Sequence, residues 1–288
     1  MIAPVKMKET MLTVIFVTYN HEDTVAKALD SILEQETIYK YEIWICEDCS
    51  TDSTLKICKQ YAEKYPNKIR LIAQPKNTKL KHLRSILCEI KTRYFGCLEG
   101  DDYWCDKQKI QIAIDTLESN PEYITFAHDT LYDNFIDKTK QSLVHDIHKI
   151  DIHNPVNFLS APYLHTSSRI YRNVIDFQKY PRGLIMGDIY VYYLFLDKGY
   201  LYYYDKIMSV YNILENGTWA GLDKKKQERN TEIAFFAINN LLDYKYDLFF
   251  TKKIKKAKML DIFKRILGLR LGWRLYLLIM CHNIKNNI

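Results

Sequence analysis

The chain holds 288 residues, of which 48% are hydrophobic and 26% are charged, and its formal net charge is +6. This length can bury a full core without disulfides or a structural metal. Seven scattered cysteines and an N-terminus without an apolar signal segment predict a cytoplasmic protein. No run of about 18 uncharged apolar residues occurs, which argues against a chain that spans a membrane.

The positive charge is concentrated at the C-terminal end. Residues 245–288 contain 11 Lys or Arg against 2 Asp, so the rest of the chain is net negative. Basic residues that alternate with apolar and aromatic ones suit a helix lying on an anionic bilayer, and one expectation is peripheral contact with the inner face of the plasma membrane. The alternative is an apolar face packed on the rest of the protein, with the lysines in solvent. No nucleic-acid-binding module accompanies the charge, and we expect no nucleic-acid partner.

The first 128 residues alternate between strand-like and helix-like periodicity. Apolar runs predict strands at residues 12–17, 41–46, 69–73, 94–98 and 123–127, and helical patterns fill the gaps at 24–34, 53–64, 82–91 and 107–118. Strands and helices that alternate at this spacing form right-handed crossovers. The sequence therefore predicts an α/β fold, with a mostly parallel, Rossmann-like sheet and helices on both of its faces.

The second half is less regular. Residues 133–157 are polar and without period, which predicts loops or a short hairpin, and a strand at 165–171, a helix at 188–196 and an aromatic strand at 200–211 follow. Helical patterns dominate from residue 224 onward. We expect one domain over residues 1–222, divided functionally into halves 1–128 and 129–222, and a basic amphipathic helical extension over 223–288.

Polar side chains follow three of the predicted strands. Val17, Thr18, Tyr19 and Asn20 end the first strand, in a loop that can hold a nucleobase by stacking and hydrogen bonding. Asp48, after the second strand, offers a carboxylate that could accept a uracil imide proton. Either group alone is equally consistent with an ordinary helix cap. Lys81, before the third helix, is either a phosphate or base contact or a solvated surface lysine.

The third of these strand ends is acidic. Glu99, Asp101 and Asp102 follow the predicted strand at residues 94–98, and carboxylates crowded in this way repel one another unless a cation lies among them. Open α/β sheets bind their ligands at the carboxyl ends of their strands. The three strand ends together predict one crevice in which a divalent metal and a diphosphate meet.

As a set, these motifs resemble the family 2 inverting glycosyltransferases of the GT-A fold. Residues 17–20 resemble the family's first loop, Glu47-Asp48-Cys49-Ser50-Thr51-Asp52 its Asp-Asp-Gly-Ser-Thr-Asp signature, and Glu99-Gly100-Asp101-Asp102-Tyr103-Trp104 its metal motif. The resemblance implies that Asp101 and Asp102 bind Mn²⁺ or Mg²⁺ and that Glu99 and Asp101 lie on the ribose side of the nucleotide-sugar. The chain departs from the pattern at Cys49, where glycine is usual, and at Glu47 and Glu99, where aspartate is more common.

The resemblance also implies residues for the acceptor half. Met186-Gly187-Asp188-Ile189-Tyr190 resembles the family's catalytic-base site, which makes Asp188 the expected general base, and a helix N-cap is the competing interpretation. Residues 215–221 resemble a mobile Gly-Trp loop, in which Trp219 either covers a sugar or anchors the core. His165 and Thr166 could line the acceptor pocket, although a lone strand histidine is more often structural.

The resemblance thus implies a metal-dependent enzyme that moves one sugar from a nucleotide-diphosphate donor, with UDP the expected nucleotide. The expected acceptor is a saccharide or lipid-linked saccharide in bacterial surface polysaccharide, lipooligosaccharide or capsule synthesis. No Gln-x-x-Arg-Trp motif is present, which argues against processive synthesis. Two alternatives stay open: a sugar nucleotidyltransferase, for which the Gly-rich loop after the first strand is missing, and a catalytically silent saccharide-binding relative.

Overall fold

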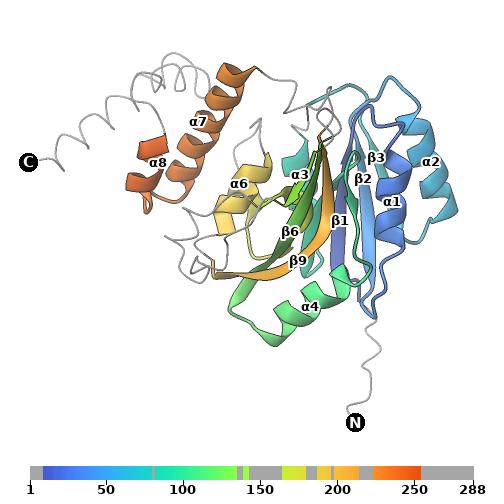
Figure 1. The fold of residues 1–288 in the computed structure, drawn as a ribbon, viewed down its shortest axis with the longest axis horizontal. Coiled ribbons are helices and arrows are strands. Elements are labelled where there is room, and N and C mark those ends of the chain that lie inside the picture. Colours follow the sequence, from blue (N-terminus) through green and yellow to red (C-terminus); the bar gives the residue numbers. More distant parts are fainter. Residues whose placement is uncertain are drawn as a thin grey trace, which may run out of the picture. The chain divides into compact units, whose positions relative to one another are not determined.

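The computed structural model describes residues 9–79, 82–134, 139–142, 164–179, 187–195, 198–213 and 223–253 (Figure 1). The chain divides into two compact units, Met1–Gly221 and Leu222–Ile288, and each is described by itself. As functional divisions, the boundaries expected at residues 128 and 222 stay predictions.

The first unit is built on one nine-stranded sheet. Its strands are β1 (Leu12–Thr18), β2 (Tyr41–Glu47), β3 (Ile69–Ala73), β4 (Tyr94–Glu99), β5 (Tyr103–Trp104), β6 (Tyr123–Asn134), β7 (Thr139–Ser142), β8 (Ile170–Arg172) and β9 (Tyr200–Ile213). They follow the order β3-β2-β1-β4-β8-β6-β9-β5, and β7 pairs with β6. The first four strands in this order are parallel, whereas β8 is antiparallel to both of its neighbours. The predicted α/β class with a mostly parallel sheet is confirmed.

Among the described residues, the helices of this unit are α1 (Val25–Leu33), α2 (Thr54–Lys64), α3 (Leu83–Glu89), α4 (Lys109–Ser119) and α6 (Gly187–Leu194), with short 3₁₀ turns η2 (Thr166–Ser168) and η3 (Phe177–Lys179). The first four helices match the predicted positions within a few residues. In the ribbon, α1 and α2 lie beside β1, β2 and β3 (Figure 1).

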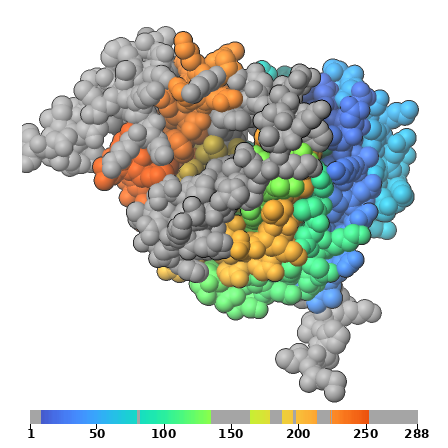
Figure 2. All heavy atoms as spheres, viewed as in Figure 1, coloured from blue at the N-terminus to red at the C-terminus, as the bar shows by residue number. Residues whose placement is uncertain are grey.

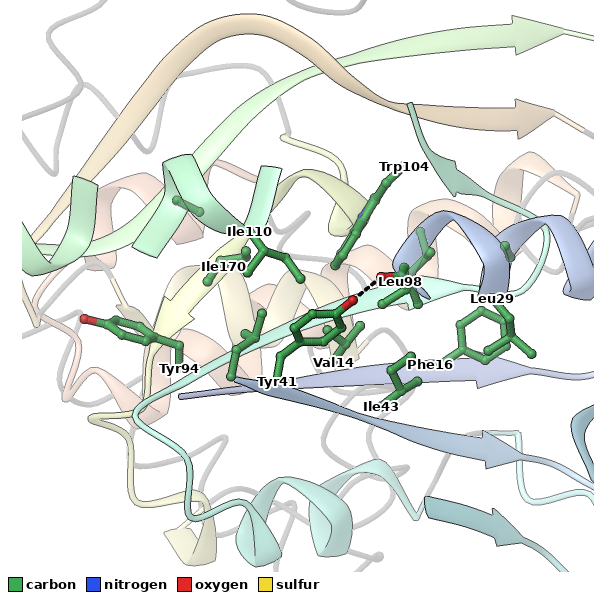
Figure 3. Close-up of a cluster of buried hydrophobic side chains, with 14 of the residues drawn as sticks. Val14, Phe16, Leu29, Tyr41, Ile43, Tyr94, Leu98, Trp104, Ile110 and Ile170 are labelled. Atoms are coloured by element: carbon green, nitrogen blue, oxygen red, sulfur yellow. Dashed lines mark hydrogen bonds between the residues drawn. The ribbon is translucent and has the colours of Figure 1, made fainter. Parts of the chain in front are cut away.

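One face of the sheet packs on α1, α2 and α4. Alternate residues of β1, such as Val14 and Phe16, join Leu29 of α1 and Ile110 of α4 in a single buried cluster (Figure 3). The hydroxyl of Tyr41, which belongs to this cluster, donates a hydrogen bond to the last turn of α1. Because every residue of β1 is buried, this strand lies at the centre of the sheet and is covered on both faces.

The opposite face is aromatic. Phe95 of β4 stacks on Tyr171 of β8 with ring centroids 5.2 Å apart, and its ring also lies near Phe177 of η3 and Phe195 after α6. These contacts place η3 and the end of α6 on this face. The sheet is therefore covered on both sides, as in doubly wound α/β folds.

The second half of the chain completes the sheet with a long strand pair. β6 and β9 run parallel over their whole lengths, with register shifts near His128, and β7 forms a hairpin with the end of β6, as expected for part of residues 133–157. The strand expected at residues 165–171 is only partly correct, because residues 166–168 form η2 before β8 begins. His165 accepts a hydrogen bond from the Ser167 N–H, and Ser168 Oγ donates back to the His165 carbonyl. Such local side-chain bonds compete with strand pairing.

The second unit contains α7 (Lys224–Leu241) and α8 (Asp247–Lys253). Asp223 caps α7 by accepting a hydrogen bond from the Lys226 N–H, and Asn239 of α7 donates to Asp247 at the start of α8. No helix in the described part of the chain is long and apolar enough to cross a bilayer. Most of the basic segment, residues 254–288, lies outside the described residues.

Candidate active site

The loops that follow β1 and β2 are tied to each other. The Asn20 side-chain oxygen accepts a hydrogen bond from the Thr51 N–H at 2.8 Å, and the Asn20 N–H donates to Ser50 Oγ at 3.0 Å. Tyr19, which precedes Asn20 in the first loop, keeps 36% of its surface exposed. The first loop therefore presents one aromatic ring to solvent on a backbone that the second loop fixes.

The structure explains two departures from the family pattern, which are Glu47 and Cys49. The Glu47 carboxylate is fully buried and accepts hydrogen bonds from the N–H groups of Cys49 and Ser50, so its longer side chain shapes the turn. Cys49 has a φ of 63°, in the left-handed region that glycine adopts most easily. The backbone conformation that favours glycine in the family is thus present here with a cysteine.

Asp48 is buried and connects β2 to the segment before α3. One of its oxygens accepts hydrogen bonds from the N–H and hydroxyl of Thr78, and the imidazole of His82 lies 3.6 Å from the same oxygen. Burial lowers the pKa of His82, although the Asp48 charge opposes this. Asp48 therefore holds the segment before α3 against the end of β2. Lys81, the expected phosphate or base contact, lies outside the described residues.

The acidic cluster stands at the end of β4, between the β1 loop and β9. Asp102 is 1% exposed, and its Oδ1 accepts a hydrogen bond from the Asn212 N–H of β9. Among the described residues, its buried Oδ2 has no hydrogen-bond partner. Ligand atoms of Glu99, Asp102 and His165 lie within 4.8 Å of one another. The cluster is thus a set of hard oxygen donors joined by one imidazole.

Like charge destabilises the ionised forms of these carboxyl groups. Burial and the charges of Asp101 and Asp188 raise the pKa of Glu99 to about 8. Burial and the charges of Asp101 and Glu99 raise the pKa of Asp102 well above its usual range, against the Asn212 hydrogen bond. A cation bound among these oxygens would stabilise the ionised carboxylates and lower their pKa values.

His165 is neutral in this environment. Burial, followed by the charges of Arg169 and Lys109, lowers its pKa to about 3. A neutral imidazole can offer a lone pair to a metal ion, whereas a protonated one cannot. His165 and Thr166 are both 8% exposed, and His165 lies beside the acidic cluster, while their part in an acceptor pocket stays a prediction.

Asp101 faces the β1 loop rather than β9. Its carboxylate lies 3.7 Å from His21 Nε2, while His21 Nδ1 lies within hydrogen-bond distance of Thr18 Oγ1. The Asp101 carbonyl accepts a hydrogen bond from the Asn212 side chain. The acidic turn is therefore held between the first strand and the last.

Gly100 allows this close approach, and replacing it tests the packing. An added Cβ would lie 2.5 Å from Thr18 Oγ1 and 2.7 Å from His21 Nδ1. We expect Gly100→Ala to lower the free energy of unfolding by about 1–3 kcal/mol and to weaken nucleotide binding, because the β1 loop must move. Urea unfolding and UDP titration measure the two effects, and wild-type values in both would contradict the described contact.

Asp188 lies within the first turn of α6, where the helix dipole favours negative charge. Its charge raises the pKa of Glu99 and of the Tyr211 phenol, so the side chain lies near the acidic cluster. The structure therefore brings Asp188 together with Glu99. In the described part of α6, Asp188 is the second residue, and whether it acts as the base or as a helix cap stays a prediction.

Val17 and Trp219 complete the comparison with the expected site. The Val17 side chain is 5% exposed, so the residue can contribute only backbone, and its carbonyl accepts a hydrogen bond from the Gly100 N–H. Trp219 lies outside the described residues.

Several polar and aromatic residues around the cluster were not anticipated from the sequence. Arg169 is 1% exposed, donates a hydrogen bond to Thr166 and lies over the Tyr192 ring of α6. Its charge opposes the rise in the pKa of Glu99. The sequence offered one signal for Arg169, which stands next to apolar residues in a predicted strand. An isolated buried charge needs partners, so such an arginine indicates polar groups nearby. His21 and Asn212 carried no comparable signal.

The comparisons with known proteins agree with this geometry. Residues 13–183 match the family model described as glycosyl transferase family 2. The model covers more than half of the chain, and the protein belongs to this family. Its fold is the GT-A fold.

Two relatives illustrate the range of the family. An uncharacterised protein of Mycobacterium tuberculosis is 26% identical over 220 residues, which are 75% of this chain and 63% of that protein. The chain therefore spans less than two thirds of that relative's length. The UDP-Glc:α-D-GlcNAc-diphosphoundecaprenol β-1,3-glucosyltransferase WfaP of Escherichia coli is 28% identical over 129 residues, 44% of this chain and 49% of WfaP.

Two solved structures share the fold. TarS residues 1–349 of S. aureus, in complex with UDP-GlcNAc, aligns with a TM-score of 0.57 at 16% identity over 89% of this chain and 81% of that one. The mannosyltransferase PcManGT of Pyrobaculum calidifontis, in complex with GDP-Man and Mn²⁺, aligns with a TM-score of 0.57 at 16% identity, over 84% and 66%. At these identities the likeness concerns the fold alone.

Proposed function

We propose that this protein is a metal-dependent, inverting glycosyltransferase that moves one sugar from a nucleotide-diphosphate donor to a saccharide acceptor. The observation that carries the proposal is Asp102, a buried carboxylate at the end of β4. Its Oδ2 has no hydrogen-bond partner among the described residues and lies 3.9 Å from Nδ1 of His165. Crowded carboxylates at this edge of a parallel sheet are typical of a cation that binds a diphosphate.

The nucleotide lies on the β1 and β2 side of the cluster in this proposal. Tyr19 and Asn20 contact the base and ribose from a loop that the β2 loop fixes, with Val17 and Thr18, which are both buried, contributing only their backbone. Asp48 accepts from the base, and Lys81 contacts a phosphate. UDP is the expected nucleotide, as in the TarS complex, whereas PcManGT binds GDP-Man.

The residues present fit a hard divalent cation, Mn²⁺ or Mg²⁺. Asp102 is one of the two expected donors, and ligand atoms of Glu99 and the neutral His165 lie within 4.8 Å of its carboxylate. Asp101, the other expected donor, is not part of this group, and its carboxylate lies 3.7 Å from His21 Nε2. When bound, such a cation neutralises the charge that develops on the departing diphosphate. The chain's own residues keep Asp102 dry and oriented, through burial and the Asn212 hydrogen bond.

Asp188 is the proposed general base. It removes the proton from the acceptor hydroxyl as that oxygen attacks the sugar carbon from the face opposite the leaving group, so that configuration inverts. The effect of its charge on the pKa of Glu99 supports this role, because it indicates that Asp188 faces the same crevice as the acidic cluster. Trp219 is proposed to close over the sugars, and Thr166 to stand near the acceptor.

For the acceptor, we propose a lipid-linked saccharide of bacterial surface polysaccharide, lipooligosaccharide or capsule synthesis. The name of WfaP contains such a diphosphoundecaprenol acceptor. The charge pattern of residues 245–288 supports a cytoplasmic enzyme that lies on an anionic membrane surface.

Release of nucleoside diphosphate tests the proposed activity. The purified chain is incubated with UDP-Glc, UDP-GlcNAc and GDP-Man, with Mn²⁺ or with EDTA, and released UDP or GDP is measured. We expect release from at least one donor that requires Mn²⁺ and rises with a saccharide acceptor. No release from any donor would favour the silent relative. Pyrophosphate formed from UTP and a sugar phosphate would identify a nucleotidyltransferase instead.

A further inference from the structure

A pair of tyrosines lies beside the acidic cluster on the two longest strands. Tyr132 of β6 is directly opposite Tyr211 of β9, and the two ring centroids are 4.9 Å apart at an interplanar angle of 65°. The His165 ring lies 4.4 Å from Tyr211 and 6.2 Å from Tyr132. The three rings therefore form one cluster next to the residues proposed to hold the cation.

The register of the strands shows where this pair leaves the core. One pleat earlier on the same face, Thr130 and Ser209 are fully buried and share a hydrogen bond, and Ser209 also contacts Ser167 of η2. Tyr132 and Tyr211 follow two residues later and are partly exposed. Figure 2 shows atoms of residues 200–213 at the surface of the view. The tyrosine pair thus stands where this face of β6 and β9 emerges from the buried layer.

The tyrosine hydroxyls are available for a ligand. Within the described part of the chain, neither phenol oxygen has a hydrogen-bond partner, and neither is sealed from solvent. Burial and the charges of Glu99, Asp102 and Asp101 raise the pKa of the Tyr211 phenol. Tyr211 is therefore a neutral aromatic ring beside hydrogen-bond acceptors.

The sheet order separates this pair from the proposed nucleotide loops. β1 and β2 lie on one side of β4, and β6 and β9 lie on the other. The diphosphate is proposed to bind at the end of β4. A ligand group that extends from the diphosphate away from β1 and β2 would therefore lie against Tyr132 and Tyr211. Carboxylates repel a further phosphate there but accept hydrogen bonds from sugar hydroxyls.

We propose that Tyr132 and Tyr211 form a platform on which a pyranose ring stacks at the reaction centre, with its apolar C–H face on the tyrosine rings and its hydroxyls toward the carboxylates. The inference rests on the proposed function and deepens it. The ring can belong to the donor sugar or to the acceptor, and the chemistry of recognition is the same for both.

Binding of UDP and of a UDP-sugar distinguishes the two sources. Wild type, Tyr211→Ala and Tyr132→Ala are titrated calorimetrically with UDP and with the UDP-sugar that the wild type turns over, in the presence of Mn²⁺. We expect UDP affinity to be unchanged in all three. If the platform holds the donor sugar, the Kd of the UDP-sugar rises about 2- to 12-fold, and if it holds the acceptor, KM for the saccharide acceptor rises by that factor instead.

Three controls separate stacking from folding. Tyr211→Phe and Tyr132→Phe keep the rings and should retain most of the affinity. Tyr202→Ala removes another partly exposed ring from β9, which packs on Tyr123 and lies outside the cluster. This variant should lower Tm without changing the Kd of the UDP-sugar or the KM of the saccharide acceptor. Unchanged sugar constants in Tyr211→Ala and Tyr132→Ala, or an equal loss of UDP affinity, would overturn the platform while leaving the proposed activity intact. A wild type that binds no nucleotide-sugar would overturn both.

Discussion

Asp188→Asn should lower kcat for sugar transfer by about 10²–10⁴-fold, because the amide cannot take the acceptor proton. The Kd for UDP with Mn²⁺ should stay close to the wild-type value, since Asp188 lies on α6 and the proposed nucleotide contacts lie on the loops after β1 and β2. Initial rates with the acceptor found in a saccharide panel, together with UDP calorimetry, measure both quantities.

Asp176→Asn is the matched control for this change. Asp176 is exposed and accepts a hydrogen bond from the Gln178 N–H, so its replacement makes the same chemical change away from the site. It should leave kcat and the UDP Kd unaltered. A fully active Asp188→Asn enzyme would remove Asp188 from the mechanism and leave it as a charge favoured by the helix dipole.

Asp102→Asn should have effects of opposite sign with and without a divalent ion. In the metal-free protein the raised pKa of Asp102 means that its ionised form destabilises the fold above the ordinary carboxyl pKa. The amide removes this charge and keeps an oxygen to accept the Asn212 N–H bond, so we expect the metal-free variant to be at least as stable as the wild type at pH 7–8.

With Mn²⁺ and UDP the order should reverse. A ligand at about 100 times its Kd stabilises the wild type by about 2.7 kcal/mol, and the variant should lose most of this stabilisation together with donor turnover. Melting curves at pH 7.5, with Mn²⁺ and UDP or with EDTA, measure both states. A Mn²⁺-dependent rise in Tm that survives in Asp102→Asn would show that the ion binds elsewhere.

The first half of the fold could be predicted because its signals are local. β1, β2 and β4 are short apolar runs, and each helix between them has an apolar face, so periodicity locates the elements and their alternation gives a parallel sheet. The second half follows weaker signals. The η2 turn at residues 166–168 forms through local side-chain bonds that a strand pattern does not show.

The candidate site also contains some residues that could be predicted from the sequence and others that could not. The carboxylates at residues 99–102 are adjacent in sequence, so their crowding can be read directly. The positions of His165 and Tyr211 next to them depend on how β8, β6 and β9 pair after β4, which no local pattern specifies. Arg169 could have been suspected as a charge in an apolar run, but its partners come from the tertiary fold.

Strand β9 contacts the turn proposed to bind the donor and also carries one of the tyrosines proposed to hold a sugar. Asn212 holds the turn that carries Asp101 and Asp102, and its neighbour Tyr211 faces the opposite side of the pleat. Changes that reshape this strand to suit a new sugar therefore also move the donor-side carboxylates. With the proposed roles, that shared strand constrains the evolution of sugar preference in this protein, and we expect an exchange of β9 between family members to transfer donor and acceptor properties as one unit.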